Sequence, residues 1–452
     1  MEDKKYNEWI KPGIFNGLQK VSIPLFGVLS TALLAHEVLS KHDMGVWVNF
    51  LTITTFAEMF RDGIVRSALI RYINFSEKKD HVEIMSSAFF LNVLISLLAA
   101  ILLFTFSHHI EGFLKSPGLS YMLRIYAFTL IFLVFFSHIE WLMYAHSSFK
   151  NLFLTYLVRQ GGTLLAIFVY YLIFGMATVK TLVFIYTGGI AAGMITGFLL
   201  MRSLFSLRFV MSGKWISTLW NFGKFVFGTN IGSLIFRSAD QFLLSNITGS
   251  AGLVASQNIS IRIVNVADIP SQTIGDILFP KSSNPDLLKR PGQIKYYYEK
   301  AVGSALSIVL PFIVVVLLFP KYIILILAGR QYFDAIPYLQ VVSFTAIFLA
   351  YIKQWGVIID STGRPQINFI VLVILSALQI TFCYFFISRY SLMGAAYALL
   401  STNVIGFIIT QSLLHRYFKI NFLNCFKYCF LFYPEIFSLL YEKFLRPKFI
   451  KQ

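Results

Sequence analysis

Charged residues are scarce in this sequence. Asp, Glu, Lys and Arg make up 13% of its 452 residues, whereas 57% are hydrophobic. A soluble domain carries about 25% charged residues. This shortage argues against a soluble protein and predicts an integral membrane protein with many spans. Acids are scarcer than bases, 21 against 38, and the net charge is +17.

Cysteines and nucleotide-binding motifs are also few. Cys383, Cys425 and Cys429 form no paired CxxC motif, so we expect neither a disulfide framework nor a metal site. No GxxxxGK[ST] motif occurs, which argues against ATP hydrolysis by this chain. No cleavable signal is recognised after the polar first residues, so the first span is expected to direct insertion. We expect no cofactor and no nucleic-acid partner, and leave open a coupling ion, H⁺ or Na⁺.

Apolar stretches long enough to cross a bilayer, about 20 residues each, occur twelve times. They lie at 14–38, 44–68, 84–107, 119–144, 151–174, 181–203, 216–245, 252–279, 299–319, 335–360, 366–388 and 391–414. The sequence therefore predicts an all-α polytopic membrane protein of about twelve transmembrane helices.

Lysine and arginine outside the spans fall mostly in segments that lie on one side if the amino terminus is cytoplasmic. This bias predicts that both termini are cytoplasmic. The basic tail, 417–452, contains a short apolar stretch that Pro434 is expected to interrupt, and an interfacial helix on anionic lipid is the preferred interpretation. A partial thirteenth span over residues 428–441 stays open.

A weak internal repeat appears at an offset of about 207 residues. Residues 39–53 align with 247–261, so that Gly45 matches Gly252. Repeated halves with the substrate site between them are typical of secondary transporters. We therefore predict two six-helix lobes, 1–210 and 211–416, followed by the tail.

One stretch, 56–72, carries four charges inside a long apolar segment. On a helix, Glu58, Arg61, Asp62 and Arg66 share one face. A charge near the bilayer centre costs roughly 2.5–3.5 kcal/mol, so this face must meet protein or water. Two interpretations remain: pairs within the helix that hold helices together, or a hydrated cavity wall that faces a polar ligand.

Other charges also fall within predicted spans. The candidate cationic cavity comprises Lys20, Arg61, Arg66, Arg159 and Arg262. The acids expected to pair with these bases are Glu58, Asp62 and Glu140. The candidates for coupling-ion binding or gating are Arg237, Asp240 and Asp268. With Arg124, the bases of the first half and of the eighth span outnumber the acids there. Because arginine fits phosphate oxygens, this excess suggests a substrate with a phosphate or pyrophosphate head.

Three stretches resemble the polysaccharide flippase family, called Wzx in bacteria. They are TFAEMFRDGIVRSALIRYI, FRSADQFLLSNITGSAGLVASQNISIRIVNV followed by LFPKSS, and DSTGRPQINFIVLV. The family belongs to an exporter superfamily that includes lipid II flippases and multidrug antiporters. The resemblance covers essentially the whole chain through residue 416.

The resemblance implies a V-shaped fold of two six-helix lobes in the bacterial inner membrane. It also implies that undecaprenyl-pyrophosphate-linked oligosaccharide moves to the outer leaflet by alternating access, without chemistry, for O-antigen or other surface polysaccharide. Polymerase and chain-length proteins are implied partners. In related lipid II flippases, basic residues on the first, second and eighth spans line the cavity, and Lys20, Arg61 and Arg262 match these positions. Lys20 departs from the usual arginine, and two acids lie near Arg61.

Three other functions remain as alternatives. A cation-coupled multidrug antiporter would need acids rather than a basic excess. A membrane polysaccharide polymerase or glycosyltransferase would need a large outer loop, although histidines 36, 42, 108 and 109 gather near the outer side. A non-transporting scaffold would leave the buried charges without a use.

Overall fold

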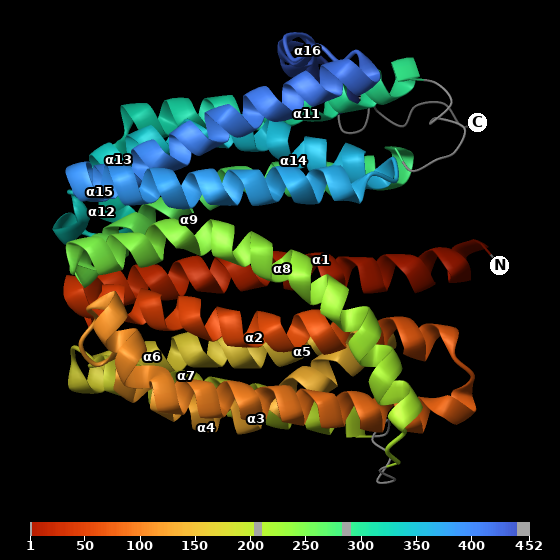
Figure 1. The fold of residues 1–452 in the computed structure, drawn as a ribbon, viewed down its shortest axis with the longest axis vertical. Helices are drawn as coiled ribbons and strands as arrows, with labels where there is room; N and C mark the ends of the chain where they lie inside the picture. Colours follow the sequence, from red (N-terminus) through yellow and green to blue (C-terminus); the bar gives the residue numbers. More distant parts are fainter. Residues whose placement is uncertain (1, 203–209, 283–290, 441–452) are drawn as a thin grey trace, which may run out of the picture. The chain divides into compact units, whose positions relative to one another are not determined.

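The chain is helical throughout the part that its computed structural model describes, residues 2–202, 210–282 and 291–440 (Figure 1). The first helices are α1 (Glu2–Leu33), η1 (Leu34–Val38), α2 (Lys41–Phe75), η2 (Lys78–Asp80), α3 (His81–Leu114), α4 (Leu119–Ala145), α5 (Phe149–Tyr156), η3 (Leu157–Gly161), α6 (Gly162–Phe174) and α7 (Val179–Met201). The later helices are α8 (Gly213–Thr248), α9 (Ala251–Ser282), α11 (Pro291–Leu318), α12 (Pro320–Ala328), η5 (Arg330–Tyr332), α13 (Ala335–Ser343), α14 (Thr345–Ser361), α15 (Pro365–Phe418) and α16 (Asn424–Leu440).

Within the described residues, the twelve predicted spans fall on helices, which confirms an all-α polytopic architecture. Seven helices in the described residues are long and apolar enough to cross a membrane, or eight if the bent pair α13 and α14 forms one span. The helices α2, α8 and α9, which carry more charged and polar residues, are not among them. The two predicted spans at 366–388 and 391–414 share α15, whose backbone leaves the helical region at Ser391 (φ 52°, ψ −126°).

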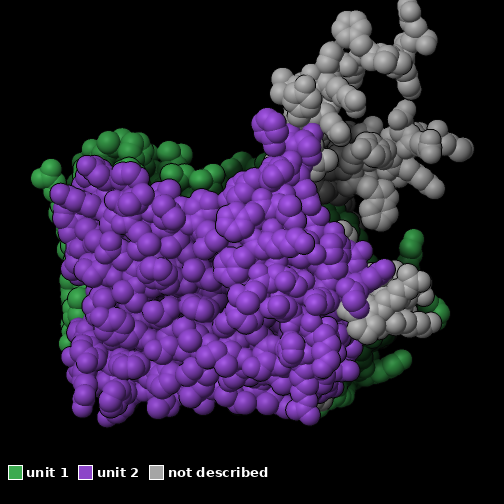
Figure 2. Space-filling model, turned by 90° about the horizontal axis from the view of Figure 1, so that it is seen from above, with its two compact units in different colours: residues 1–256, 326–331 green, residues 257–325, 332–452 purple. Residues whose placement is uncertain are grey.

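The chain forms two compact units (Figure 2). The first comprises residues 1–256 and 326–331, and the second comprises 257–325 and 332–452. Helix α8 packs along α2 and α3 and therefore belongs to the first unit. The predicted lobes, divided at residue 210, differ from these units, because the contacts of α8 are with the helices that precede it.

In the second unit, α16 packs along α11. The Tyr433 hydroxyl donates to the Ser307 carbonyl at 2.6 Å, and Asn424 donates to the buried Glu299 carboxylate. The helix continues through Pro434. This packing buries Cys425 and Cys429.

Glycines allow α2 to approach its neighbours closely. A Cβ atom at Gly223 of α8 would collide with the Ile64 backbone of α2, and one at Gly45 would collide with the Ala251 backbone at the start of α9. Small residues permit such close helix packing inside membranes. The repeat-related Gly252 lies beside the Lys41 side chain, so the two segments aligned in the sequence contact each other.

We predict that Gly223→Ala destabilises the protein by about 1–3 kcal/mol, because the new methyl group overpacks the α2–α8 contact. Gly228→Ala, one and a half turns further along α8, is the matched control, since a Cβ atom there meets nothing within 4 Å. The control should be neutral or stabilising by up to about 1 kcal/mol from helix propensity. Thermal unfolding in detergent measures both, and equal midpoints would contradict the packing.

Candidate functional site

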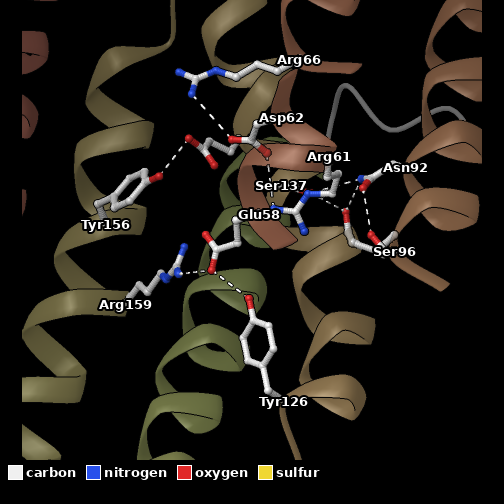
Figure 3. A network of polar contacts seen from close by, with 12 residues as sticks. Glu58, Arg61, Asp62, Arg66, Asn92, Ser96, Tyr126, Ser137, Tyr156 and Arg159 are labelled. Carbon is white, nitrogen blue, oxygen red and sulfur yellow. Dashed lines mark hydrogen bonds and ion pairs between the residues drawn. The ribbon is translucent and has the colours of Figure 1, made fainter. Parts of the chain in front are cut away.

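The charged face of α2 meets α4 and the α5–η3 segment within the first unit (Figure 3). The α2 charge cluster consists of Glu58, Arg61, Asp62 and Arg66 from α2, Tyr126 and Glu140 from α4, Tyr156 from α5 and Arg159 from η3. It therefore combines the four charges of one sequence stretch with groups from helices that lie 60 to 100 residues further on.

Glu58 is held by two partners. Its Oε1 accepts a hydrogen bond from the Tyr126 hydroxyl at 3.0 Å and lies 3.9 Å from Nη2 of Arg159. Arg159 stacks its guanidinium over the Phe136 ring, 4.6 Å from its centre. A Cβ atom at Gly193 of α7 would lie 2.9 Å from Cβ of Arg159, so glycine makes the room for this buried side chain.

Asp62 is shared between two arginines. Its Oδ1 lies 3.4 Å from Nη2 of Arg61, and its Oδ2 lies 3.8 Å from Nη1 of Arg66. Arg66 also stacks over the Tyr144 ring at 4.4 Å. Both Asp62 and Arg66 are partly exposed, at 29% and 33% of their side chains. They form the accessible edge of the cluster.

Glu140 lies deeper. It is buried, and its Oε1 accepts a hydrogen bond from the Tyr156 hydroxyl at 2.9 Å. The neutral hydroxyl groups of Tyr126 and Tyr156 thus donate hydrogen bonds to the carboxylates of Glu58 and Glu140. A buried carboxylate without such donors would be costly.

Arg61 is the least satisfied member of the cluster. Its side chain is 3% exposed, and its Nε and Nη1 have no hydrogen-bond partner among the residues that the structure describes. The Trp141 ring lies 5.9 Å from the guanidinium, and the buried indole Nε1 of Trp141 likewise has no partner in the described part of the chain. A buried donor without an acceptor costs about 1–3 kcal/mol, and more if it is charged. This corner of the cluster therefore presents donors that fit an anion or water.

The cluster contains as many acids as bases among the side chains that the structure describes. Three carboxylates, of Glu58, Asp62 and Glu140, match three guanidinium groups in this cluster. The basic excess predicted from the sequence also counts Lys20, Arg124 and Arg262, and it stays a prediction. Of the other predicted bases, Arg124 is exposed and donates to Ser107. The Lys20 side chain lies outside the described residues.

The remaining candidates lie on α8 and α9. Arg262, in the second unit, donates from Nε to Asn258 at 2.8 Å. Asp268 forms an ion pair with Lys353, and its Oδ1 has no hydrogen-bond partner in the described residues. Asp240 is buried and accepts from the backbone N–H of Gln241, whereas Arg237 is exposed. The structure does not bring Arg237 or Asp240 into the α2 charge cluster.

Sequence reasoning missed the phenol groups of Tyr126 and Tyr156. They are two of 23 tyrosines, and nothing in their local pattern sets them apart. It also missed the ion-pair partner of Asp268, which is Lys353 of α14. Pairing across helices depends on packing that spacing does not reveal.

Residues 34–337, more than half of the chain, match the family described as "Polysaccharide biosynthesis protein". The chain belongs to this family. This polysaccharide biosynthesis protein is 27% identical over 438 residues to an uncharacterized membrane protein, MJ1068, of Methanocaldococcus jannaschii, with 92% of this chain and 86% of that protein covered. It is 24% identical over 386 residues to a protein of Shigella flexneri named "Putative O-antigen transporter", with 83% and 89% covered.

The fold of this polysaccharide biosynthesis protein is similar to that of the lipid II flippase MurJ in an inward closed conformation. The TM-score is 0.77, the sequence identity is 14%, and 97% of this chain and 94% of that chain are covered. The predicted resemblance and the exporter-type fold are therefore confirmed. The chain is a multi-pass membrane protein of this polysaccharide biosynthesis family, and its fold is similar to that of a lipid II flippase.

We predict that Glu58→Gln destabilises the protein by about 2 kcal/mol, because it leaves the buried Arg159 without its counter-charge. The double variant Glu58→Gln/Arg159→Met should recover much of that loss, since it removes both charges. Thermal unfolding of Glu58→Gln, Arg159→Met and the double variant in detergent completes this double-mutant cycle. Additive losses would show that the two side chains do not stabilise each other.

Proposed function

We propose that this protein is a flippase for undecaprenyl-pyrophosphate-linked oligosaccharide, working by alternating access in the bacterial inner membrane. The observation that carries the proposal is Arg61 of a polysaccharide biosynthesis protein, which lies on the predicted span 44–68. Its Nε and Nη1 are buried and have no hydrogen-bond partner among the described residues. Arginine offers several donors in a planar arrangement that fits phosphate oxygens.

The α2 charge cluster supports this function because its arginines are loosely held. The Asp62 contacts of Arg61 and Arg66, at 3.4 and 3.8 Å, are longer than the 2.7–2.9 Å typical of charge-assisted hydrogen bonds. A pyrophosphate that reaches the accessible edge, at Asp62 and Arg66, can therefore compete for both guanidinium groups. Two arginines then face the anion, and the displaced carboxylate needs water or a proton.

The physical task is to carry polar groups across about 30 Å of hydrocarbon, where each would lose its water. Donors fixed in the protein replace that water for the pyrophosphate, while the prenyl tail stays in lipid. No covalent bond is made or broken, so the protein acts as a transporter and not as an enzyme. Polymerase and chain-length proteins are the partners that would use the delivered product.

A second candidate is a cation-coupled multidrug antiporter. The equal number of acids and bases in the cluster favours it, because Glu58, Asp62 and Glu140 offer three carboxylates to a cation. Lost resistance to cationic dyes in cells lacking the gene, with normal lipid-linked oligosaccharide, would support this function over the flippase.

We predict that Arg61→Met lowers transport of lipid-linked oligosaccharide by about 10- to 100-fold, the loss expected when hydrogen bonds to a charged group disappear. We predict that Arg262→Ala, in the second unit, abolishes transport. The measurement is the sidedness of the polyprenyl-pyrophosphate oligosaccharide in cells that express each variant. Intact oligosaccharide should accumulate on the cytoplasmic face.

Arg124→Met is the matched control for Arg61→Met. Arg124 lies on α4, is exposed and takes no part in the cluster, so its variant should transport normally. Normal surface polysaccharide in both Arg61→Met and Arg262→Ala cells would contradict the proposal that these arginines bind the substrate. Single repeat units that gather on the outer face would instead indicate a polymerase.

A further inference from the structure

A polar pocket lies at one end of the first unit, away from the α2 charge cluster. Three separate segments form it: η1 with the turn that follows it, the end of α6, and residues 328–331. Its volume is about 760 Å³, within the range of about 300–1,000 Å³ typical of ligand sites. All three segments lie at predicted outer connections between spans, so the pocket is expected to be open to water on the outer side.

Backbone irregularities shape the first and third walls. The segment η1 is a π-helix, and such turns are frequent at functional sites. The Ala35 carbonyl of η1 accepts a hydrogen bond from Nε2 of Gln331 at 2.5 Å, and Nε2 of His36 lies 3.0 Å from the Ile326 carbonyl. Gly329 has a positive φ of 87° and lies against the His36 ring, where a Cβ atom would be 3.2 Å from Nδ1.

The second wall is tied to the first by two further hydrogen bonds. The Tyr171 hydroxyl donates to Oε2 of Glu37 at 2.8 Å, and the backbone N–H of Ala177 donates to the Val38 carbonyl at 2.9 Å. Gly175 makes the turn between them with a positive φ of 77°. The pocket is thus pre-formed, which lowers the entropy cost of binding.

The chemistry of the lining fits a neutral ligand with many hydroxyl groups. Glu37 supplies acceptors, Arg330 supplies donors, and Gln331 and Ser40 can serve as both. The lining residues contribute one carboxylate and one guanidinium, so the pocket does not select strongly for an anion or a cation. Leu39 and Met176 add apolar surface that can cover the CH face of a sugar ring.

We propose that this pocket binds sugar residues of the translocated oligosaccharide, beyond its pyrophosphate-bearing end. The inference rests on the proposed function and adds a second site to it. The α2 charge cluster receives the charged head, and the pocket receives neutral sugars as they reach the outer side. A long oligosaccharide has sugars far enough from the pyrophosphate to reach the pocket, so its transport should depend on the pocket residues. A lipid with a single sugar cannot reach the pocket, so its transport should not depend on them.

The experiment compares two substrates in proteoliposomes that contain the full-length protein. One is polyprenyl pyrophosphate with a complete repeat unit, and the other carries a single sugar. We expect Glu37→Gln and Arg330→Gln to raise KM for the complete repeat unit by about tenfold, the effect of one hydrogen bond to a charged group, with kcat little changed. Transport of the single-sugar lipid should not change.

Arg389→Gln is the matched control, because Arg389 is an exposed arginine that lines no part of this pocket. Equal losses for the two substrates, or no loss for either, would overturn the sugar-binding proposal while leaving the flippase function intact.

A second readout separates the two proposals. Saturation-transfer NMR measures binding of the free repeat-unit oligosaccharide, released from its lipid by mild acid, to wild-type protein and Arg330→Gln. If the protein moves neither lipid yet binds the free oligosaccharide through Arg330, the flippase proposal fails and the pocket stands. If lipid is transported but the free oligosaccharide does not bind, only the pocket proposal fails.

Discussion

The neutralisation of charge on α2 is the constraint on which the first unit depends. Four charged side chains on one helix face cannot meet lipid, because each would lose its hydration without compensation. Their partners come from α4, α5 and η3, so these helices must pack against that face. The opposite face carries Phe60, which packs on Phe227 of α8 with ring centres 4.4 Å apart. One helix thus has a polar face and an apolar face, and its orientation follows from both.

Irregular backbone appears where a side chain or carbonyl takes part in a polar site. The π-helix η3 carries Arg159 toward Glu58, and the π-helix η1 carries the carbonyl that Gln331 binds. In both places a regular α-helix would change the rotation of the following residues. The segments that hold the two sites therefore deviate from the regular geometry that the surrounding spans keep.

The two sites differ in the ligand chemistry they can satisfy. The α2 charge cluster lies at predicted spans and keeps guanidinium donors without acceptors among the described residues, which suits a charged group that has left water. The pocket at the end of the unit has a volume of about 760 Å³, holds one carboxylate and one guanidinium and lies at predicted connections, which suits a neutral polyhydroxylated group still in contact with water. A lipid-linked oligosaccharide has both kinds of group on one molecule, and the distance between them is set by its sugars.

The sequence alone determined that the chain is a helical membrane protein, roughly where its helices lie, which family it resembles and that the face with Glu58, Arg61, Asp62 and Arg66 is polar. These features follow from hydrophobicity and helical periodicity, which are local properties. Only the tertiary structure decided that Arg159 pairs with Glu58 and that Tyr126 and Tyr156 donate hydrogen bonds to Glu58 and Glu140. It also decided that residues 326–331 join the first unit. Contacts between distant segments depend on packing, and a single sequence carries no direct record of them.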